Sequence, residues 1–210
     1  MQQSSVGFKS KGITLEGIVS TPRSAEGSSP GAVLYHPHPL FGGNMYNAVV
    51  TALVRALEEA GIASLRFNFR GVGNSSGEFT GGKSEGADII SIIEFLFTHT
   101  LVDGSRIGIF GYSFGAWMAM QLLMRRPEID RFIIVAPPAD SKDFNFLAPC
   151  PSSGLFIHGD RDEVASHDTT KILSEKLQKQ KLFPSDRQAL QIILCNNLYV
   201  HRYLLPHLPS

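Results

Sequence analysis

Hydrophobic and polar residues follow two patterns along most of the chain, one of which predicts strands and the other helices. Short continuous apolar runs are typical of strands that are buried on both faces of a parallel sheet. These runs occupy residues 31–35, 62–69, 107–110, 132–136, 155–158 and 190–194. Apolar residues spaced three and four apart predict amphipathic helices. This spacing is found in residues 47–60, 88–97, 114–126 and 169–181. Strands that alternate with helices in this way favour right-handed crossovers and an α/β fold.

The N-terminal segment has a different pattern. Residues 6–10 and 13–20 alternate between apolar and polar positions, with Lys11-Gly12 between them, which predicts an antiparallel hairpin. The expected architecture is a mostly parallel central sheet that begins with this hairpin and carries helices on both faces. Functional groups are then expected on the loops at the carboxyl ends of the strands. A chain of 210 residues, 43% of them hydrophobic, fits one domain that spans residues 1–210.

Composition excludes several classes of partner. Nineteen basic residues balance nineteen acidic residues, so no strong field would attract nucleic acid or an anionic membrane. No apolar run approaches the roughly 20 residues of a membrane span, and the first residues lack the pattern of a signal peptide. Cys150 and Cys195 stand far apart, which is typical of reduced thiols. These features predict a soluble cytoplasmic protein and do not indicate an oligomeric state.

The most informative motif is Gly111-Tyr112-Ser113-Phe114-Gly115, which follows an expected strand and precedes an expected helix. The two glycines allow a turn so sharp that a side chain at either position would collide with backbone. The serine hydroxyl is then displayed above the edge of the sheet, which is typical of a nucleophile. The alternative is a structural turn that happens to carry a serine.

A serine nucleophile requires a base and a group that orients the base. Where such a turn joins a strand to a helix, the acid and then the histidine follow in the sequence. Asp162, after the strand expected at residues 155–158, is the preferred acid. Asp160 directly follows Gly159 and is expected to cap the turn through backbone N–H groups. Asp160 and Asp140 remain the alternative acids.

The base should follow the last expected strand, at residues 190–194, which leaves His201 and His207. His201 is preferred because it lies closer to that strand, whereas His207 lies in a proline-rich tail. A third possibility is that no histidine acts as the base. His167 follows Asp162 by only five residues and is expected to cap a helix or to face solvent.

A tetrahedral intermediate needs preorganised donors for its oxyanion. The N–H of Phe114 qualifies because it follows the nucleophile at a helix N-terminus, where the dipole also favours negative charge. The second donor is expected in the loop after residues 31–35. Two prolines of that loop have no N–H, which leaves His38 as the preferred donor and Leu40 as the alternative.

Four motifs occur in order along residues 6–181. They are His36-Pro-His-Pro-Leu-Phe-Gly-Gly-Asn-Met45, Leu65-Arg-Phe-Asn-Phe-Arg-Gly-Val-Gly73, Gly111-Tyr-Ser-Phe-Gly115 and His158-Gly-Asp-Arg-Asp162. Together they resemble the small bacterial serine hydrolases of the α/β-hydrolase superfamily, which have dienelactone-hydrolase-like and peptidase-like relatives. The resemblance implies a triad of Ser113, Asp162 and a histidine. It also implies hydrolysis of an ester or related acyl bond in a small molecule, no cofactor, and a compact site without a large lid.

Residues 182–210 depart from the pattern of this superfamily. Its members place Gly-Ala-Asp-His and aromatic residues after the last strand, followed by a closing helix. Here Cys195-Asn-Asn-Leu-Tyr-Val-His201 is followed by a proline-rich tail, which a shifted reading frame would produce. The alternative function is therefore a catalytically impaired hydrolase scaffold that acts as a binding protein.

Two further patterns suggest different chemistry. Residues 77–84 match the phosphate-binding loop of nucleotide-binding proteins. Such a loop should leave a strand directly and enter a helix, whereas the nearest strand is expected to end near Phe69. His36 and His38 could instead ligate a metal ion, although no carboxylate pair accompanies them.

Overall fold

The computed structural model describes residues 2–22, 27–129, 131–147, 152–159, 162–176 and 180–185. Its strands are β1 (Gln2–Ser10), β2 (Ile13–Thr21), β3 (Ser29–Tyr35), β4 (Ala63–Phe67), β5 (Val102–Tyr112), β6 (Arg131–Val135), β7 (Ser153–Gly159) and β8 (Gln180–Ser185). Its helices are α1 (Ala48–Glu59), α2 (Glu85–Thr98), α3 (Phe114–Leu123) and α4 (His167–Lys176), with short 3-10 turns η1 (Pro39–Phe41) and η2 (Asn145–Leu147). Helices and strands alternate after the first hairpin, as the hydrophobic pattern predicts.

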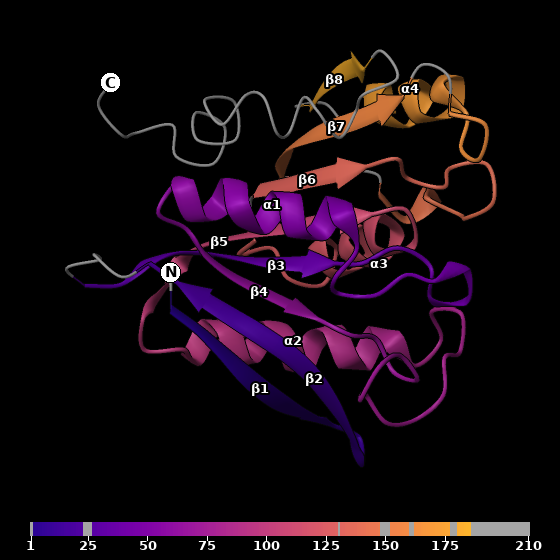
Figure 1. Ribbon diagram of the computed structural model, residues 1–210. Coiled ribbons are helices and arrows are strands. Elements are labelled where there is room, and N and C mark those ends of the chain that lie inside the picture. Colours follow the sequence, from indigo (N-terminus) through magenta and orange to yellow (C-terminus); the bar gives the residue numbers. More distant parts are fainter. Residues whose placement is uncertain are drawn as a thin grey trace.

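Within the described residues, the strands form one eight-stranded sheet in the order β1-β2-β4-β3-β5-β6-β7-β8. β2 pairs antiparallel with β1 and with β4, and the other pairs are parallel. The arrowheads of β3, β4, β6 and β7 point the same way in Figure 1. The loops that follow these strands therefore share one edge of the sheet, and the predicted mostly parallel sheet is confirmed.

The predicted N-terminal hairpin is also confirmed. Ser10 pairs with Ile13, and the two residues between them, Lys11 and Gly12, have φ values of 41° and 86°. Two consecutive left-handed residues form the kind of tight turn whose twist matches that of the flanking strands. Glycine adopts this conformation without strain, so the Lys11-Gly12 pair fixes the register of the hairpin.

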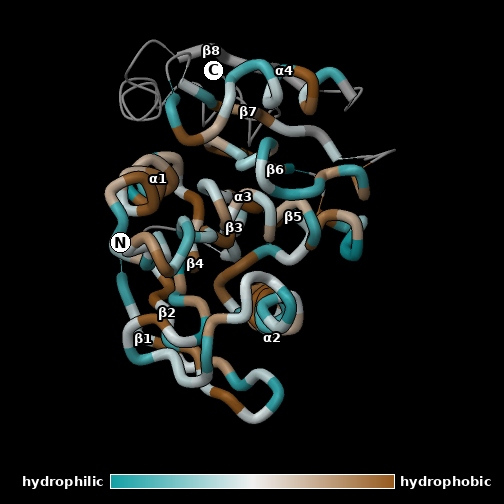
Figure 2. Tube along the Cα trace, turned by 90° about the vertical axis from the view of Figure 1, so that its right-hand side faces the viewer, coloured by the Kyte–Doolittle hydropathy of each residue, from teal (hydrophilic) through white to brown (hydrophobic). Residues whose placement is uncertain are grey.

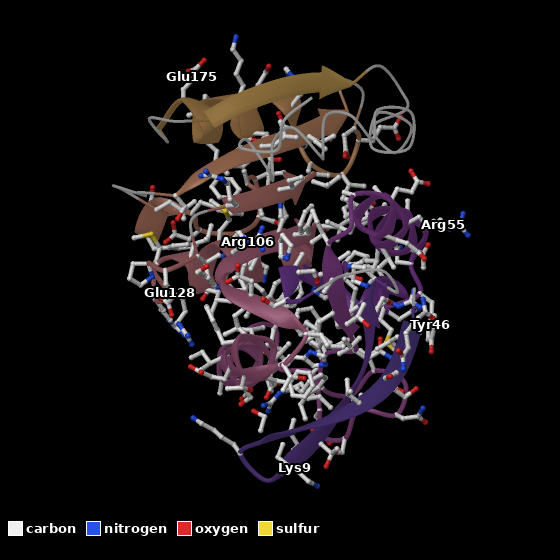
Figure 3. The ribbon with its side chains drawn as sticks, turned by 90° about the vertical axis from the view of Figure 1, so that its left-hand side faces the viewer. Lys9, Tyr46, Arg55, Arg106, Glu128 and Glu175 are labelled. Carbon is white, nitrogen blue, oxygen red and sulfur yellow. The ribbon has the colours of Figure 1, made fainter. Side chains whose placement is uncertain are left out.

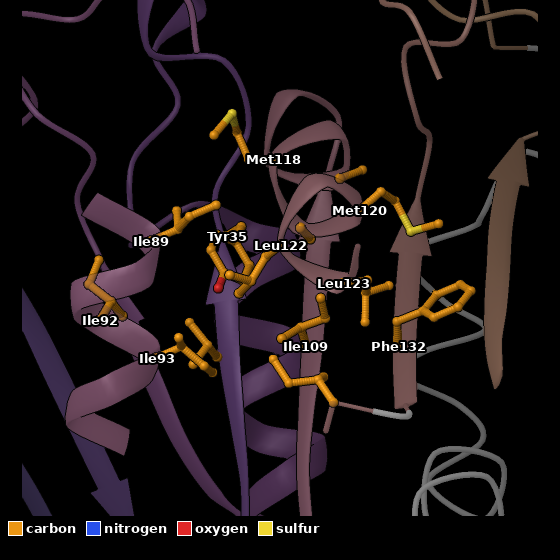
Figure 4. Close-up of a cluster of buried hydrophobic side chains, with 14 of the residues drawn as sticks. Tyr35, Ile89, Ile92, Ile93, Ile109, Met118, Met120, Leu122, Leu123 and Phe132 are labelled. Carbon is orange, nitrogen blue, oxygen red and sulfur yellow. The ribbon is translucent and has the colours of Figure 1, made fainter. Parts of the chain in front are cut away.

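Apolar side chains divide between the two faces of the sheet. Ile109 and Phe110 are adjacent in β5 and point into different clusters, because side chains alternate along a strand. On the side of Phe110, α1 covers the sheet with residues such as Leu53. On the side of Ile109, α2 and α3 form the larger cluster shown in Figure 4, to which α4 adds Leu173. Figure 2 shows α1 and α2 on opposite sides of the strands between them.

The ends of α1 follow from local chemistry. The Asn47 side chain accepts the N–H of Val49 at 2.9 Å, which satisfies one of the donors that a helix start leaves unpaired. After the last turn, Gly61 takes a left-handed conformation with φ 70°, which glycine adopts most easily. The helix predicted for residues 47–60 therefore begins and ends where the sequence indicates. No helix in the described part of the chain has the length and apolarity required to cross a bilayer.

The C-terminal side of the sheet differs from the prediction. The helix expected at residues 169–181 ends at Lys176, and Gln180 already begins β8, which pairs parallel with β7. Without this partner, β7 would present unpaired backbone groups at the edge of the sheet, so pairing overrides the helical spacing. The strand expected at residues 190–194 lies outside the described residues.

Candidate active site

Ser113 stands at the bend between β5 and α3, at the edge where the parallel strands end. Its backbone has φ 53° and ψ −118°, a conformation that costs about 1–3 kcal/mol and is typical of functional sites. Its N–H donates to the carbonyl of Val135 at 2.9 Å, which ties the bend to β6. The side chain is half-buried and makes no cap hydrogen bond to α3. The strained turn thus displays the hydroxyl without using it to stabilise the helix.

The glycines beside Ser113 permit close backbone approach. A Cβ at Gly111 would lie 2.5 Å from Cα of Ala116, and one at Gly115 would lie 2.3 Å from the carbonyl oxygen of Tyr35. Both clashes are with backbone, so rotation of a side chain cannot relieve them. The prediction that any side chain at these positions collides with backbone is confirmed, and the first turn of α3 lies directly on β3.

The loop after β3 is held by the segment after β4. The Phe69 N–H donates to Nε2 of His36 at 3.0 Å, so Nδ1 carries the proton and donates to the Pro37 carbonyl at 2.7 Å. The Met45 N–H donates to Oδ1 of Asn68 at 2.8 Å. Burial lowers the pKa of His36 to about 4, although its hydrogen bond to Pro37 acts in the opposite direction. A neutral His36 therefore fixes the point where this loop leaves the sheet.

His38 lies in the same loop, beside the bend. Its imidazole packs against the rings of Phe114 and Phe79, with centroids 5.2 Å and 5.0 Å away. Its Nδ1 accepts the N–H of Leu40 at 3.3 Å, so the alternative oxyanion donor is already engaged. No described residue supplies a backbone acceptor for the His38 N–H. Phe114 is the first residue of α3, so its N–H has no acceptor within the helix.

Asp162 lies in the loop after β7, at the same edge of the sheet. Its Oδ1 accepts the N–H groups of Val164 at 2.8 Å and Ala165 at 3.0 Å. Burial and the nearby Asp162 carboxylate raise the pKa of Tyr112, the residue immediately before Ser113. The fold therefore brings the charge of Asp162 close to the bend, although Asp162 follows Ser113 by 49 positions in the sequence.

His158, which is fully buried in β7, anchors the loop that carries Asp162. The Ala165 carbonyl lies 2.8 Å from Nε2 and can only accept, so Nε2–H is the donor. Nδ1 then accepts the hydroxyl of Thr170 at 3.1 Å. The sequence patterns assigned no role to His158 or to the side chain of Thr170. No signal in a single sequence could have revealed this contact, because it depends on how the loop folds back on β7.

Asp140, one of the alternative acids, is engaged elsewhere. Its Oδ2 accepts the N–H of Ser166 at 2.6 Å and its Oδ1 accepts the hydroxyl of Thr169 at 3.0 Å. These bonds hold the start of α4. His167 is the first residue of that helix. The helix is capped by Ser166 in place of His167, because the Ser166 hydroxyl accepts the N–H of Asp168 at 3.2 Å.

Three sequence candidates, Asp160, His201 and His207, lie outside the described residues. The identity of the base and the choice between Asp162 and Asp160 therefore stay predictions. Among the described candidates, the fold gathers His38, Asp162, the bend at Ser113 and the first residue of α3, Phe114, at one edge of the sheet.

The resemblance of residues 77–84 to a phosphate-binding loop has a different explanation. The buried carboxylate of Glu85 accepts the N–H of Thr80 at 2.7 Å, the Thr80 hydroxyl at 2.6 Å and the N–H of Gly82 at 2.8 Å. Burial alone would raise the pKa of Glu85, but these hydrogen bonds keep it below its ordinary value. Donors that a phosphate would need therefore bind a carboxylate of the chain itself. The metal interpretation is disfavoured as well, because both ring nitrogens of His36 are hydrogen-bonded.

Comparison with known protein sequences finds similarity to one family model and to several individual proteins. A family model described as X-Pro dipeptidyl-peptidase (S15 family) matches residues 11–194. An uncharacterised protein of Rickettsia prowazekii is 44% identical over 165 residues, which are 76% of this chain and 69% of that protein. Human mitochondrial palmitoyl-protein thioesterase is 32% identical over 123 residues, which are 57% of this chain and 37% of that protein.

Solved structures of similar proteins share the whole fold. A protein of unknown function from Agrobacterium tumefaciens has a TM-score of 0.86 at 38% identity, covering 99% of this chain and 100% of its own. An α/β serine hydrolase without a lid from Xanthomonas campestris has a TM-score of 0.82 at 28% identity, covering 100% and 97%. A serine hydrolase homologue from Coxiella burnetii has a TM-score of 0.82 at 29% identity, covering 100% of this chain and 99% of its own. The predicted α/β-hydrolase fold is confirmed.

Proposed function

The chain belongs to the peptidase S15 family of the α/β-hydrolases, and we propose that it is a serine hydrolase that cleaves a carboxylic ester or thioester through an acyl-enzyme. The observation that carries the proposal is the backbone of Ser113, which is strained, flanked by two obligatory glycines and placed at the edge of the sheet. Strain of this kind persists where the surrounding structure enforces it, and functional sites are where it concentrates.

In the proposed reaction, Oγ of Ser113 attacks the carbonyl carbon while its proton passes to His201. The N–H groups of Phe114 and His38 stabilise the oxyanion, and Asp162 orients and stabilises the protonated imidazole. Collapse of the intermediate breaks the acyl bond, and His201 returns the proton to the leaving alcohol or thiol. Water then releases the acid by the same steps, and no cofactor takes part.

Two features of the site mouth favour an acyl chain over a peptide. Leu40 and Phe41, in the loop that carries His38, expose 75% and 87% of their surface, and the Phe41 ring lies 5.0 Å from the imidazole. Apolar surface of this kind suits an alkyl or aryl group. A dipeptidyl substrate would bring an ammonium group, which the ammonium of Lys142, 5.8 Å from the Phe114 ring, would repel. The thioesterase relative adds thioesters to the candidate substrates.

Hydrolysis of p-nitrophenyl butyrate tests the proposal, with the thioester butyryl-thiocholine and Ala-Pro p-nitroanilide as parallel substrates. We expect turnover of the esters by the unmodified protein and a loss of about 10⁴-fold or more in kcat for Ser113→Ala and His201→Ala. Ser4→Ala, which changes a solvent-exposed serine of β1, is the matched control and should keep full activity.

The competing hypothesis is a catalytically impaired scaffold that binds a ligand or partner. It predicts the same low background rate for the unmodified protein, Ser113→Ala and His201→Ala. A loss in Ser113→Ala without any loss in His201→Ala would instead keep the hydrolase and remove His201 as its base. Exclusive cleavage of the dipeptidyl anilide would replace the ester and thioester with a peptide substrate.

A further inference from the structure

Lys142 lies on the loop after β6, next to the first turn of α3. Its Nζ is 4.6 Å from the ring centroid of Trp117 and 5.8 Å from that of Phe114, so the ammonium rests on both aromatic rings. The same loop is fixed to α3 by a second contact, in which the Trp117 Nε1–H donates to the Asp143 carbonyl at 2.9 Å. Lys142 is therefore held beside the residue that follows the nucleophile.

The charge of Lys142 acts on the oxyanion loop. Burial first, and the Lys142 charge second, lower the pKa of His38. None of the described residues forms an ion pair with Lys142. The two nearest carboxylates along its loop are solvent-exposed and accept other donors: Asp140 binds the start of α4, and Asp143 accepts the Asn145 N–H at 2.8 Å. Lys142, a half-buried residue without a carboxylate partner among the described residues, thus places its ammonium over the Phe114 ring beside the candidate site.

Space for a substrate group adjoins this ammonium. Lys142 lines a cavity of about 490 Å³ between its own loop and α4, with Phe144, Ile172 and Leu173 as apolar neighbours. The carboxylates of Asp140 and Asp143 line the same cavity, and each already accepts the backbone N–H described above. The walls are partly apolar and partly polar, which suits a short chain that ends in a charged group. Trp117, hydrogen-bonded to the loop that forms one wall, connects the cavity to the first turn after Ser113.

We propose that Lys142 is a specificity-determining residue that selects esters or thioesters whose acyl group carries a carboxylate, such as monoesters of short dicarboxylic acids. The ammonium binds the distal carboxylate while Ser113 attacks the ester carbonyl. This inference rests on the proposed function and adds the class of acyl group. An acyl carboxylate gains a charge-assisted hydrogen bond from an ammonium that forms no ion pair with a described carboxylate, because Asp140 and Asp143 of the same cavity accept other donors.

Turnover of a matched pair of esters tests the inference. Mono-4-nitrophenyl adipate and p-nitrophenyl hexanoate have six-carbon acyl groups and differ in the terminal carboxylate. The ratio of their kcat/KM values, measured within each protein, cancels any change in the folded fraction. We expect Lys142→Met to lower the adipate-to-hexanoate ratio about 10- to 100-fold, the range for loss of one charged hydrogen bond.

Two control variants sharpen the readout. Lys142→Arg keeps the charge and should hold the ratio within about threefold of its original value. Lys9→Met removes a lysine from the β1–β2 hairpin (Figure 3) and should leave the ratio unchanged. Added salt should lower the ratio in the unmodified protein, because it screens the attraction, and have little effect in Lys142→Met. An equal ratio in the unmodified protein and Lys142→Met would overturn the inference while leaving the hydrolase proposal intact.

Binding to the Ser113→Ala variant separates this inference from the proposed function. Calorimetry of that variant with the two esters needs no catalysis, and the adipate should bind more tightly than the hexanoate only while Lys142 is present. Lys142-dependent binding without hydrolysis by the unmodified protein would contradict the proposed hydrolase but support the anion site. Equal binding of the adipate with and without the Lys142→Met change would remove the anion site.

Discussion

Two buried histidines hold the two halves of the site, and they do so through different partners. His36 binds two backbone groups, the Phe69 N–H and the Pro37 carbonyl, at the centre of the sheet. His158 binds one backbone carbonyl and the side chain of Thr170, from α4 near the far edge of the sheet. The loop after β3, which carries His38 and is called the oxyanion half here, therefore depends on backbone geometry. The loop after β7, which carries Asp162 and is called the acid half, depends also on the docking of a surface helix.

The difference extends to the residues that do the chemistry. The bend at Ser113 is enforced by Gly111 and Gly115, whose clearances to neighbouring backbone leave no room for a side chain. Asp162 is positioned by hydrogen bonds within its own loop, in which its Oδ1 accepts two N–H groups and its N–H donates to the Gly159 carbonyl at 3.3 Å, and by the contact of His158 beneath it. We infer that substitutions near the nucleophile act through folding, and that substitutions near the acid act first through catalysis.

The largest expected effect is on the acid. Asp162→Asn should lower kcat about 10⁴-fold, because an amide cannot stabilise the imidazolium and favours the wrong tautomer of the base. Ester turnover measures the loss. Asp140→Asn is the matched control: it should weaken the start of α4 and lower the melting temperature while leaving kcat within about threefold. A large loss of kcat in Asp160→Asn, with Asp162→Asn active, would assign the acid to Asp160.

The next effect concerns pH and the oxyanion half. Burial lowers the pKa of His36 from 6.5 to about 4, so between these values the unfolded chain binds a proton that the folded protein does not. Stability is therefore complete above the unfolded pKa and falls as the pH drops toward 4, by about 3 kcal/mol in total.

Urea unfolding of the unmodified protein and of His36→Gln at pH 7 and pH 4 measures this contribution. The variant should be less stable at pH 7, since it loses a buried clamp, and should lose about 3 kcal/mol less than the unmodified protein on acidification. Parallel pH profiles for the two proteins would show that His36 does not remain neutral in the fold.

A glycine substitution tests whether backbone contact between α3 and β3 holds the bend at Ser113. Gly115→Ala places a Cβ 2.3 Å from the Tyr35 carbonyl oxygen and should destabilise the protein by about 2–3 kcal/mol. Gly7→Ala places a Cβ at an ordinary 3.6 Å from Thr14 and should change stability by less than about 0.5 kcal/mol. Equal chemical stability of the two variants would mean that α3 moves away from β3 without cost.

The smallest expected effect is on the clamp of the acid half. Thr170→Val removes the donor to Nδ1 of His158 and keeps the shape of the side chain, so it should cost about 1–2 kcal/mol. It should also lower kcat about tenfold or less, because His158, which anchors the loop of Asp162, loses one of its two hydrogen bonds. Thr51→Val, in α1, removes a hydroxyl that bonds only to its own helix, and it should leave kcat unchanged.

Local pattern was sufficient for much of the fold. The Lys11-Gly12 turn, the end of α1 at Gly61 and the bend at Ser113 each follow from residues that are neighbours in the sequence. The β8 strand could not be predicted, because its conformation comes from pairing with β7 and not from its own spacing. The roles of His36, His158 and Glu85 could not be predicted either, since each depends on which loop returns to contact it. Lys142 reaches Trp117 for the same reason.

Activation of the Ser113 hydroxyl by the fold underlies every proposal above. Labelling of the native protein with a fluorophosphonate, followed by mass spectrometry of its peptides, tests this activation without knowledge of the substrate. We expect one label per chain, on Ser113, with labelling abolished in Ser113→Ala and slowed strongly in Asp162→Asn. A folded protein in which Ser113 remains unlabelled, or labels no faster than exposed serines such as Ser4, would contradict it.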